Sequence, residues 1–137
     1  MENEAKLWMQ FAETNLGTAK HLLNTYYPKP LEIICYHSQQ AAEMAIKALI
    51  IYHGAQGGMP KKHNLSFLLD QMKNMVNIPE EYYDYADILT PYGVSARYPN
   101  ELFLEERDAE EALVLSEKIM VWVKGLITEP EKEPEEE

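Results

Sequence analysis

The stretch that decides the fold is YHSQQAAEMAIKAL, residues 36–49. Three of its alanines and Tyr52 recur at intervals of three and four, so they line one face of a helix. Gln40, Glu43 and Lys47 recur at similar intervals along another face. A helix of this kind packs closely on its small-residue side and presents polar groups on the other. We therefore expect a helical bundle with a polar groove or a polar subunit interface, although no reaction follows from the pattern.

Helical periodicity and helix-breaking residues place four more helices around this stretch. The first runs from about Glu4 to Thr25 and ends before two prolines, which lack a backbone donor. The quoted stretch lies in the second, from about Leu31 to His53. A third begins at Asn64 or Ser66 and extends to Val76, a fourth runs from Pro79 to about Tyr92, and a last begins at Asp108. We expect an all-α, antiparallel up-and-down bundle of four long helices and one short helix.

Length and composition indicate one globular domain, residues 1–128, followed by a tail, residues 129–137. Hydrophobic residues make up 46% of the chain and charged residues 26%, as in ordinary soluble domains. The tail holds six acidic residues and one basic residue, which predicts a solvated, disordered extension. No apolar run approaches the roughly 20 residues that span a bilayer, and the first residues do not resemble a signal peptide. We expect a cytoplasmic protein with no membrane contact.

Charge and cysteine content exclude several classes of function. The formal charge is −11, and the body without its tail carries −6, which argues against non-specific affinity for nucleic acid because phosphate contacts need lysine and arginine. The single cysteine, Cys35, excludes an intramolecular disulfide and a multi-cysteine zinc site, and its apolar neighbours predict an inert thiol. No histidine has metal-ligand spacing. His21 and His53 suit the surface, and His37 suits a hydrogen-bonded core or interface position. We expect no metal and no cofactor.

Two short segments carry the best candidates for binding. His63 follows Lys61 and Lys62, which form the only local cluster of positive charge and could meet a phosphate; the alternative is that the lysines only aid solubility. Arg97 stands between a helix end and a proline turn, where its planar guanidinium could be held toward an anion, or could pair with an acid such as Glu43. Tyr98 beside it could stack on a base or join the core.

The chain resembles the HEPN domain (higher eukaryotes and prokaryotes nucleotide-binding) over about Glu4 to Leu126. The residues that carry the resemblance occur in the family's order: Trp8 with Ala12 and Ala19, Gln40-Ala41-Ala42-Glu43 followed by Lys47-Ala48, Gly54, His63-Asn64-Leu65, and Arg97-Tyr98-Pro99 before a final alanine-rich helix. The resemblance implies an antiparallel helical bundle that commonly dimerises. It also implies one of three roles: a metal-independent ribonuclease toxin, the partner of a minimal nucleotidyltransferase, or a nucleotide-binding domain.

The ribonuclease motif of that family is incomplete in this sequence. It consists of an arginine followed, after four to six residues, by a histidine. Arg97 matches the arginine, but Leu102, Phe103 and Leu104 stand where the histidine is required. Loss of a positioned general acid or base typically costs about 10²–10⁴-fold in rate. The sequence therefore favours a protein without ribonuclease activity.

Three functions stay open. The first is a non-catalytic, homodimeric HEPN-type module, part of a toxin-antitoxin-like pair, that binds a nucleotide or phosphate, or a nucleotidyltransferase partner. Its ligand-binding residues are Gln40, Glu43, Lys47, Lys61, Lys62, His63, Arg97 and Tyr98. The second is a degenerate ribonuclease acting on RNA, in which Arg97 and His63 are catalytic. In the third, the same polar residues form a structural hydrogen-bond network at a dimer interface and bind no ligand.

Overall fold

The computed structural model describes residues 3–54, 61–95 and 103–127. Within these ranges the chain forms six helices and no strand: α1 (Asn3–Thr25), α2 (Leu31–Tyr52), α3 (Leu65–Asp70), α4 (Glu80–Leu89), α5 (Tyr92–Ser95) and α6 (Glu106–Ile127). The expected all-α helical bundle is confirmed. None of the helices in these ranges is long and apolar enough to cross a membrane. The acidic tail, like Arg97 and Tyr98, lies outside the described residues.

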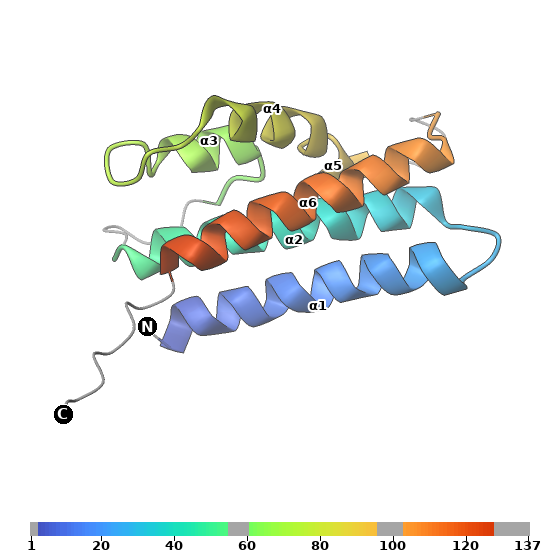
Figure 1. The fold of residues 1–137 in the computed structure, drawn as a ribbon, viewed down its shortest axis with the longest axis horizontal. Helices are drawn as coiled ribbons and strands as arrows, with labels where there is room; N and C mark the ends of the chain where they lie inside the picture. The colour runs from blue at the N-terminus through green and yellow to red at the C-terminus, as the bar shows by residue number, and fades with distance from the viewer. Residues whose placement is uncertain (1–2, 55–60, 96–102, 128–137) are drawn as a thin grey trace.

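Helix α2 lies at the centre of the bundle and contacts every other helix. Figure 1 shows α1 on one side of α2 and α6 along it, while α3 and α4 lie side by side on the opposite side from α1. The chain reverses between α1 and α2, and returns through α3, α4 and α5 before α6. The central position explains why the residue pattern of α2 decides the fold, since its small and polar faces must both meet protein.

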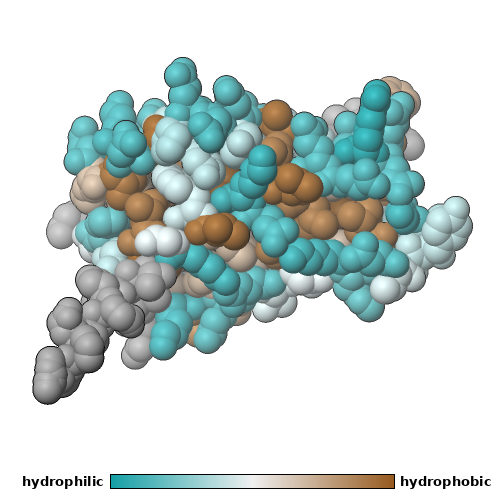
Figure 2. Space-filling view, in the orientation of Figure 1, coloured by the Kyte–Doolittle hydropathy of each residue, from teal (hydrophilic) through white to brown (hydrophobic). Residues whose placement is uncertain are grey.

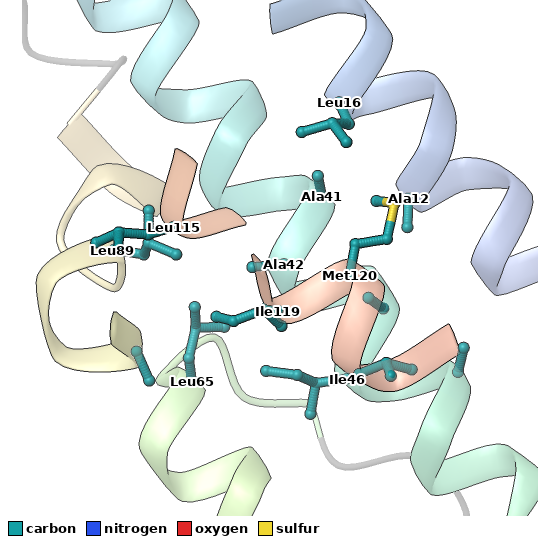
Figure 3. Packing of buried hydrophobic residues seen from close by; sticks show 14 of the residues in the cluster. Ala12, Leu16, Ala41, Ala42, Ile46, Leu65, Leu89, Leu115, Ile119 and Met120 are labelled. Atoms are coloured by element: carbon teal, nitrogen blue, oxygen red, sulfur yellow. The ribbon is translucent and has the colours of Figure 1, made fainter. Parts of the chain in front are cut away.

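Small residues bring the long helices together. Ala12, Ala41 and Ala42 are completely buried, and Figure 3 shows them where α1, α2 and α6 meet. Ile46 of α2 and Ile119 of α6 fill the space beyond them and are also inaccessible to solvent. Short side chains let helix axes approach, and larger ones then interdigitate at the density of a protein interior.

The third and fourth members of the bundle are shorter than the sequence analysis expected. Asn64 caps α3 by accepting a hydrogen bond from Phe67 N at 2.9 Å, but the helix ends at Asp70. The chain then continues in tight turns with i to i+3 hydrogen bonds, and Met72 is buried there without being helical. Asn74 and Asn77 favour turns over helix, which accounts for the early end. The helix that follows Pro79 ends at Leu89 and not at about Tyr92, because Pro91 lacks a backbone donor and separates α4 from α5.

Candidate functional site

Glu43 is the centre of a polar cluster in the middle of α2. One carboxylate oxygen, Oε1, accepts a hydrogen bond from Gln39 Nε2 at 2.9 Å. The other, Oε2, lies 2.9 Å from Lys47 Nζ and 2.9 Å from His63 Nδ1. Gln40 extends the cluster by donating from Nε2 to Gln39 Oε1 at 2.8 Å. The contacts of Gln39, Lys47 and His63 with the Glu43 carboxylate all form within one chain.

The ion pair in this cluster is almost completely removed from water. The Glu43 side chain is 5% exposed and the Lys47 side chain 8%. A buried charge is tolerated only when it is paired and hydrogen-bonded, and the i to i+4 spacing on one helix supplies that pairing. The Lys47 ammonium also lies 5.8 Å from the ring centroid of Trp8 on α1. These contacts make Glu43 and Lys47 a rigid support rather than a pair of exposed binding groups.

His63 is the most exposed member of the cluster. Its side chain is 69% exposed, although Nδ1 is held by the buried Glu43. An imidazole that donates from Nδ1 to a carboxylate leaves Nε2 for a ligand, and Nε2 accepts a hydrogen bond when the ring is neutral and donates one when the ring is protonated. The backbone around it is also fixed, because Asn64 caps α3 and Leu65 N donates to Thr90 Oγ1 at 3.0 Å. The cluster therefore holds one exposed imidazole in a defined orientation.

Lys61 and Lys62 precede this imidazole and are exposed. The Lys62 ammonium lies 5.5 Å from the ring centroid of Phe67, the residue whose amide is capped by Asn64. Together with His63 these lysines place up to three cationic groups in consecutive residues. Phosphate is the ligand chemistry that such a group of donors suits best.

Gly93 on α5 packs directly against the cluster. A Cβ atom at this position would lie 2.9 Å from Gln39 Cδ and 3.0 Å from its Oε1. The absence of a side chain at Gly93 thus allows α5 to approach the buried amide of Gln39. The contact of Gly93 with Gln39 therefore links α5 to the Glu43 carboxylate through the Gln39 side chain.

The structure brings together four of the residues selected from the sequence: Gln40, Glu43, Lys47 and His63. Glu43 and Lys47 lie inside the bundle, whereas the spacing argument had them face a groove or a subunit interface. Sequence reasoning missed Gln39, whose i to i+4 relation to Glu43 was the available signal. It also missed the roles of Trp8 and Gly93, which depend on contacts between helices and leave no local pattern.

A second polar pair lies elsewhere on α1 and α2. His37 Nδ1 is 2.7 Å from Asn15 Oδ1, and burial lowers the pKa of His37 from its ordinary value of 6.5. The expected hydrogen-bonded role of His37 is thereby confirmed. Burial also raises the pKa of the Cys35 thiol to about 12, in agreement with an inert cysteine. Across the described residues no group of three His, Cys, Asp or Glu side chains is arranged to hold a metal ion.

Comparisons with known proteins place this chain in a family. The model of the HEPN domain matches residues 5–126. The chain is 32% identical over 142 residues to a protein of Methanocaldococcus jannaschii named "Putative toxin MJ1304", covering 91% of this chain and 89% of the relative.

Solved structures agree with that match. TT1696 from Thermus thermophilus superposes with a TM-score of 0.78 at 30% identity, over 90% of this chain and 98% of that one. ST0689, described as an archaeal HEPN homologue, superposes with a TM-score of 0.71 at 29% identity, over 93% of this chain and all of that one. The chain therefore belongs to the HEPN domain family.

Proposed function

We propose that this protein is a non-catalytic HEPN module of the toxin-antitoxin type that binds a phosphate-bearing ligand, such as a nucleotide, at His63. The observation that carries the proposal is the contact of the buried Glu43 carboxylate with His63 Nδ1 at 2.9 Å, on a side chain that is 69% exposed. A side chain whose orientation is already fixed by an internal contact, and whose other side faces solvent, loses little conformational entropy when it binds a ligand. Orientation of this kind serves recognition better than it serves stability.

Charge around His63 favours an anionic ligand. Lys47 balances the charge of Glu43 inside the bundle, so Lys61, Lys62 and the imidazole itself dominate the exposed side of the cluster. Arg97 and Tyr98 belong to the proposed site as a guanidinium for a second phosphate oxygen and a ring for a base. The net charge of −11 restricts such binding to a short ligand, because a long polyanion would be repelled by the rest of the surface.

Calorimetric titration with ADP and with inorganic phosphate tests the proposal. We expect ADP to bind. Either His63→Ala or the double variant Lys61→Ala/Lys62→Ala should weaken the affinity for ADP by about tenfold or more, as expected when at least one charge-assisted contact is lost. His53→Ala, just beyond the C-terminal end of α2, is the matched control and should bind ADP as the wild type does. Equal affinity in His63→Ala and wild type would place the ligand elsewhere.

The proposed partners are a second copy of this chain and a minimal nucleotidyltransferase acting as antitoxin. The toxin name of the archaeal relative supports this setting. Affinity purification from the native host should recover a nucleotidyltransferase with the chain. Recovery of the chain alone, without partner or ligand, would argue against the two-component role.

One observation favours a second function, a metal-independent ribonuclease. A carboxylate that holds Nδ1 of an exposed histidine is the arrangement by which enzymes orient a general base. In this alternative His63 replaces the missing motif histidine and Arg97 stabilises charge on the phosphate. Metal-free incubation with structured and single-stranded RNA separates the two functions. Cleavage that falls about 10²–10⁴-fold in both His63→Ala and Arg97→Ala would establish the enzyme, and no cleavage would leave the binding module.

A further inference from the structure

The turn that joins α4 to α5, residues 90–93, contacts the backbone next to His63. We call this turn the α4–α5 corner. Thr90 Oγ1 donates a hydrogen bond to Ala86 O at 2.8 Å and accepts one from Leu65 N at 3.0 Å. Because the hydroxyl proton is used on Ala86, the lone pairs of the same oxygen are left for the Leu65 amide. Leu65 lies two residues beyond His63, so the corner holds the backbone that carries the imidazole.

The same corner also contacts the side chains that hold the imidazole from inside the bundle. Gly93 N donates to Thr90 O at 3.1 Å, which closes the turn. The Gly93 backbone lies against Gln39, since an added Cβ atom would be 2.9 Å from Gln39 Cδ. Gln39 donates to Glu43 Oε1 at 2.9 Å, and Glu43 Oε2 lies 2.9 Å from His63 Nδ1.

The two sets of contacts form a closed circuit around His63. From the corner it passes through Gln39 and Glu43 to the imidazole ring. It returns from the His63 backbone through Leu65 to the corner. A histidine has two side-chain torsions, and both are restricted when the backbone and one ring nitrogen are held. The place of the α4–α5 corner therefore determines how His63 presents Nε2 to solvent.

Apolar packing of α3 and α4 on the bundle does not explain this orientation by itself. Leu65 and Leu89 are completely buried beneath these helices. Figure 2 shows mostly hydrophilic or neutral side chains on their outward side, along the upper edge of the molecule. Burial of apolar side chains is non-directional, so it fixes the place of the two helices but not the direction of an imidazole. The directional hydrogen bonds of the circuit supply that direction.

We propose that the α4–α5 corner controls ligand binding at His63, with Thr90 and Gln39 as positioning residues. The inference rests on the ligand site of the proposed function and names what regulates its affinity. Gln39 is completely buried and acts only through Glu43. If the imidazole is correctly oriented in only about a tenth of the molecules, the apparent affinity falls about tenfold although no contact with the ligand is lost. A shift of α5 against α2 thus weakens binding at His63.

Nitrogen NMR of the histidine rings in the ligand-free protein tests the circuit. In mildly alkaline buffer the wild type should show a proton on His63 Nδ1 and none on Nε2, with the signals assigned by their loss in His63→Ala. Thr90→Val removes the hydroxyl and Gln39→Met removes the amide, so each variant should show a mixture of the two tautomers. Thr90→Ser keeps the hydroxyl and should keep the wild-type spectrum. An undisturbed Nδ1 proton in folded Thr90→Val would overturn the inference, whether or not Gln39→Met folds.

Ser66→Ala is the matched control. Ser66 Oγ donates to Asp87 Oδ1 at 2.6 Å, so this contact also joins α3 to α4 but lies outside the circuit. The variant should keep the tautomer of His63 and the affinity for ADP. Circular dichroism checks the fold of every variant. A change in Ser66→Ala as large as that in Thr90→Val would mean that any loosening of α3 against α4 disturbs the imidazole, and it would overturn the specific role of the corner.

Calorimetric titration with ADP tests whether the two routes belong to one circuit. Gln39→Met and Thr90→Val should each weaken ADP binding by about tenfold, and the double variant should bind hardly more weakly, because a circuit that is already open loses little by a second break. A loss of about a hundredfold in the double variant would show two independent effects and contradict the circuit. If the wild type does not bind ADP, the proposed function fails, whereas the tautomer of His63 still decides whether the corner positions the imidazole.

Discussion

At the scale of single residues, the central fact is a carboxylate that the fold removes from water. Glu43 is satisfied by Gln39, Lys47 and His63, and each of these contacts is 2.9 Å long. Such a group is stable only while its partners are present, because an uncompensated buried charge pays its full desolvation cost. Its partners therefore matter for stability even where they do not touch a ligand.

Lys47→Met should destabilise the protein strongly. Among the described residues, the change leaves the buried Glu43 carboxylate with only Gln39 and His63 as partners, and we expect the free energy of unfolding to fall by about 3 kcal/mol. Lys20→Met is the control, since the Lys20–Glu117 pair is about half exposed and should contribute less than about 1 kcal/mol. Urea unfolding followed by circular dichroism measures both. Equal effects of the two changes would show that Glu43 is reached by water.

His37 should make the protein less stable in mild acid. Burial lowers its pKa in the folded state below the ordinary 6.5, so between these two values the unfolded chain binds more protons than the folded one. The contribution of a neutral His37 is therefore present above pH 6.5 and is lost as the pH falls through the lowered pKa. We expect His37→Gln to reduce the drop in urea midpoint between about pH 7.5 and about pH 5.0. An unchanged drop would mean that His37 does not contribute to it.

At the scale of elements, the approach of α5 to α2 depends on one glycine. A Cβ atom at Gly93 would meet the Gln39 amide at 2.9 Å, and that amide is held by hydrogen bonds to Glu43 and Gln40. The amide cannot move without breaking these bonds. The short helix α5 is thereby connected to the polar cluster more tightly than its four residues suggest.

Two glycine-to-alanine changes should have opposite effects. Gly93→Ala forces the buried Gln39 amide aside, and we expect it to lower the free energy of unfolding by about 1–3 kcal/mol. Gly17→Ala, in the interior of α1 with no atom within 4 Å of the added Cβ, should raise it by about 0.5–1 kcal/mol. Urea unfolding of both variants tests the pair. A stabilising Gly93→Ala would show that α5 moves freely against α2.

The sequence predicts the long helices well because each has a sustained period and a clear end. Ala41, Ala45 and Ala48 of α2 are all completely buried, as their helical spacing predicts. The middle of the chain is harder, since Met72 is buried in a turn and shows the same apolar spacing that a helix would. Tertiary contacts determine whether such a segment is a helix or a turn, and the local sequence pattern does not contain information about these contacts.

The candidate site is only partly readable from the sequence. The polar spacing on α2 identifies Gln40, Glu43 and Lys47, but spacing alone cannot distinguish an outward stripe from a buried network. His63 lies 20 residues away from Glu43 along the chain, so its contact with that carboxylate depends on how the intervening loop returns. Contacts between residues this far apart in the sequence can be identified only once the fold is known.

At the scale of the whole molecule, the net charge of −11 should limit how nucleic acid binds. If ligand binding is confined to Lys61, Lys62 and His63, about three phosphate contacts form, and the logarithm of affinity should fall with the logarithm of salt concentration with a slope of about −2 for a single strand. Fluorescence anisotropy of a labelled trinucleotide and a labelled strand of about 20 nucleotides measures this. A slope of about −6 for the longer strand would reveal a more extended cationic surface.

The positions of the two tryptophans give this protein a pair of built-in optical probes. Trp8 lies beside Lys47 and the polar cluster, whereas Trp122 is stacked on Tyr82 where α4 meets α6. With Trp122→Phe, the remaining emission reports the surroundings of the cluster; with Trp8→Phe, it reports the contact between α4 and α6. Changes at the polar cluster and changes at the contact between α4 and α6 can thus be followed as separate fluorescence signals, without attaching a dye.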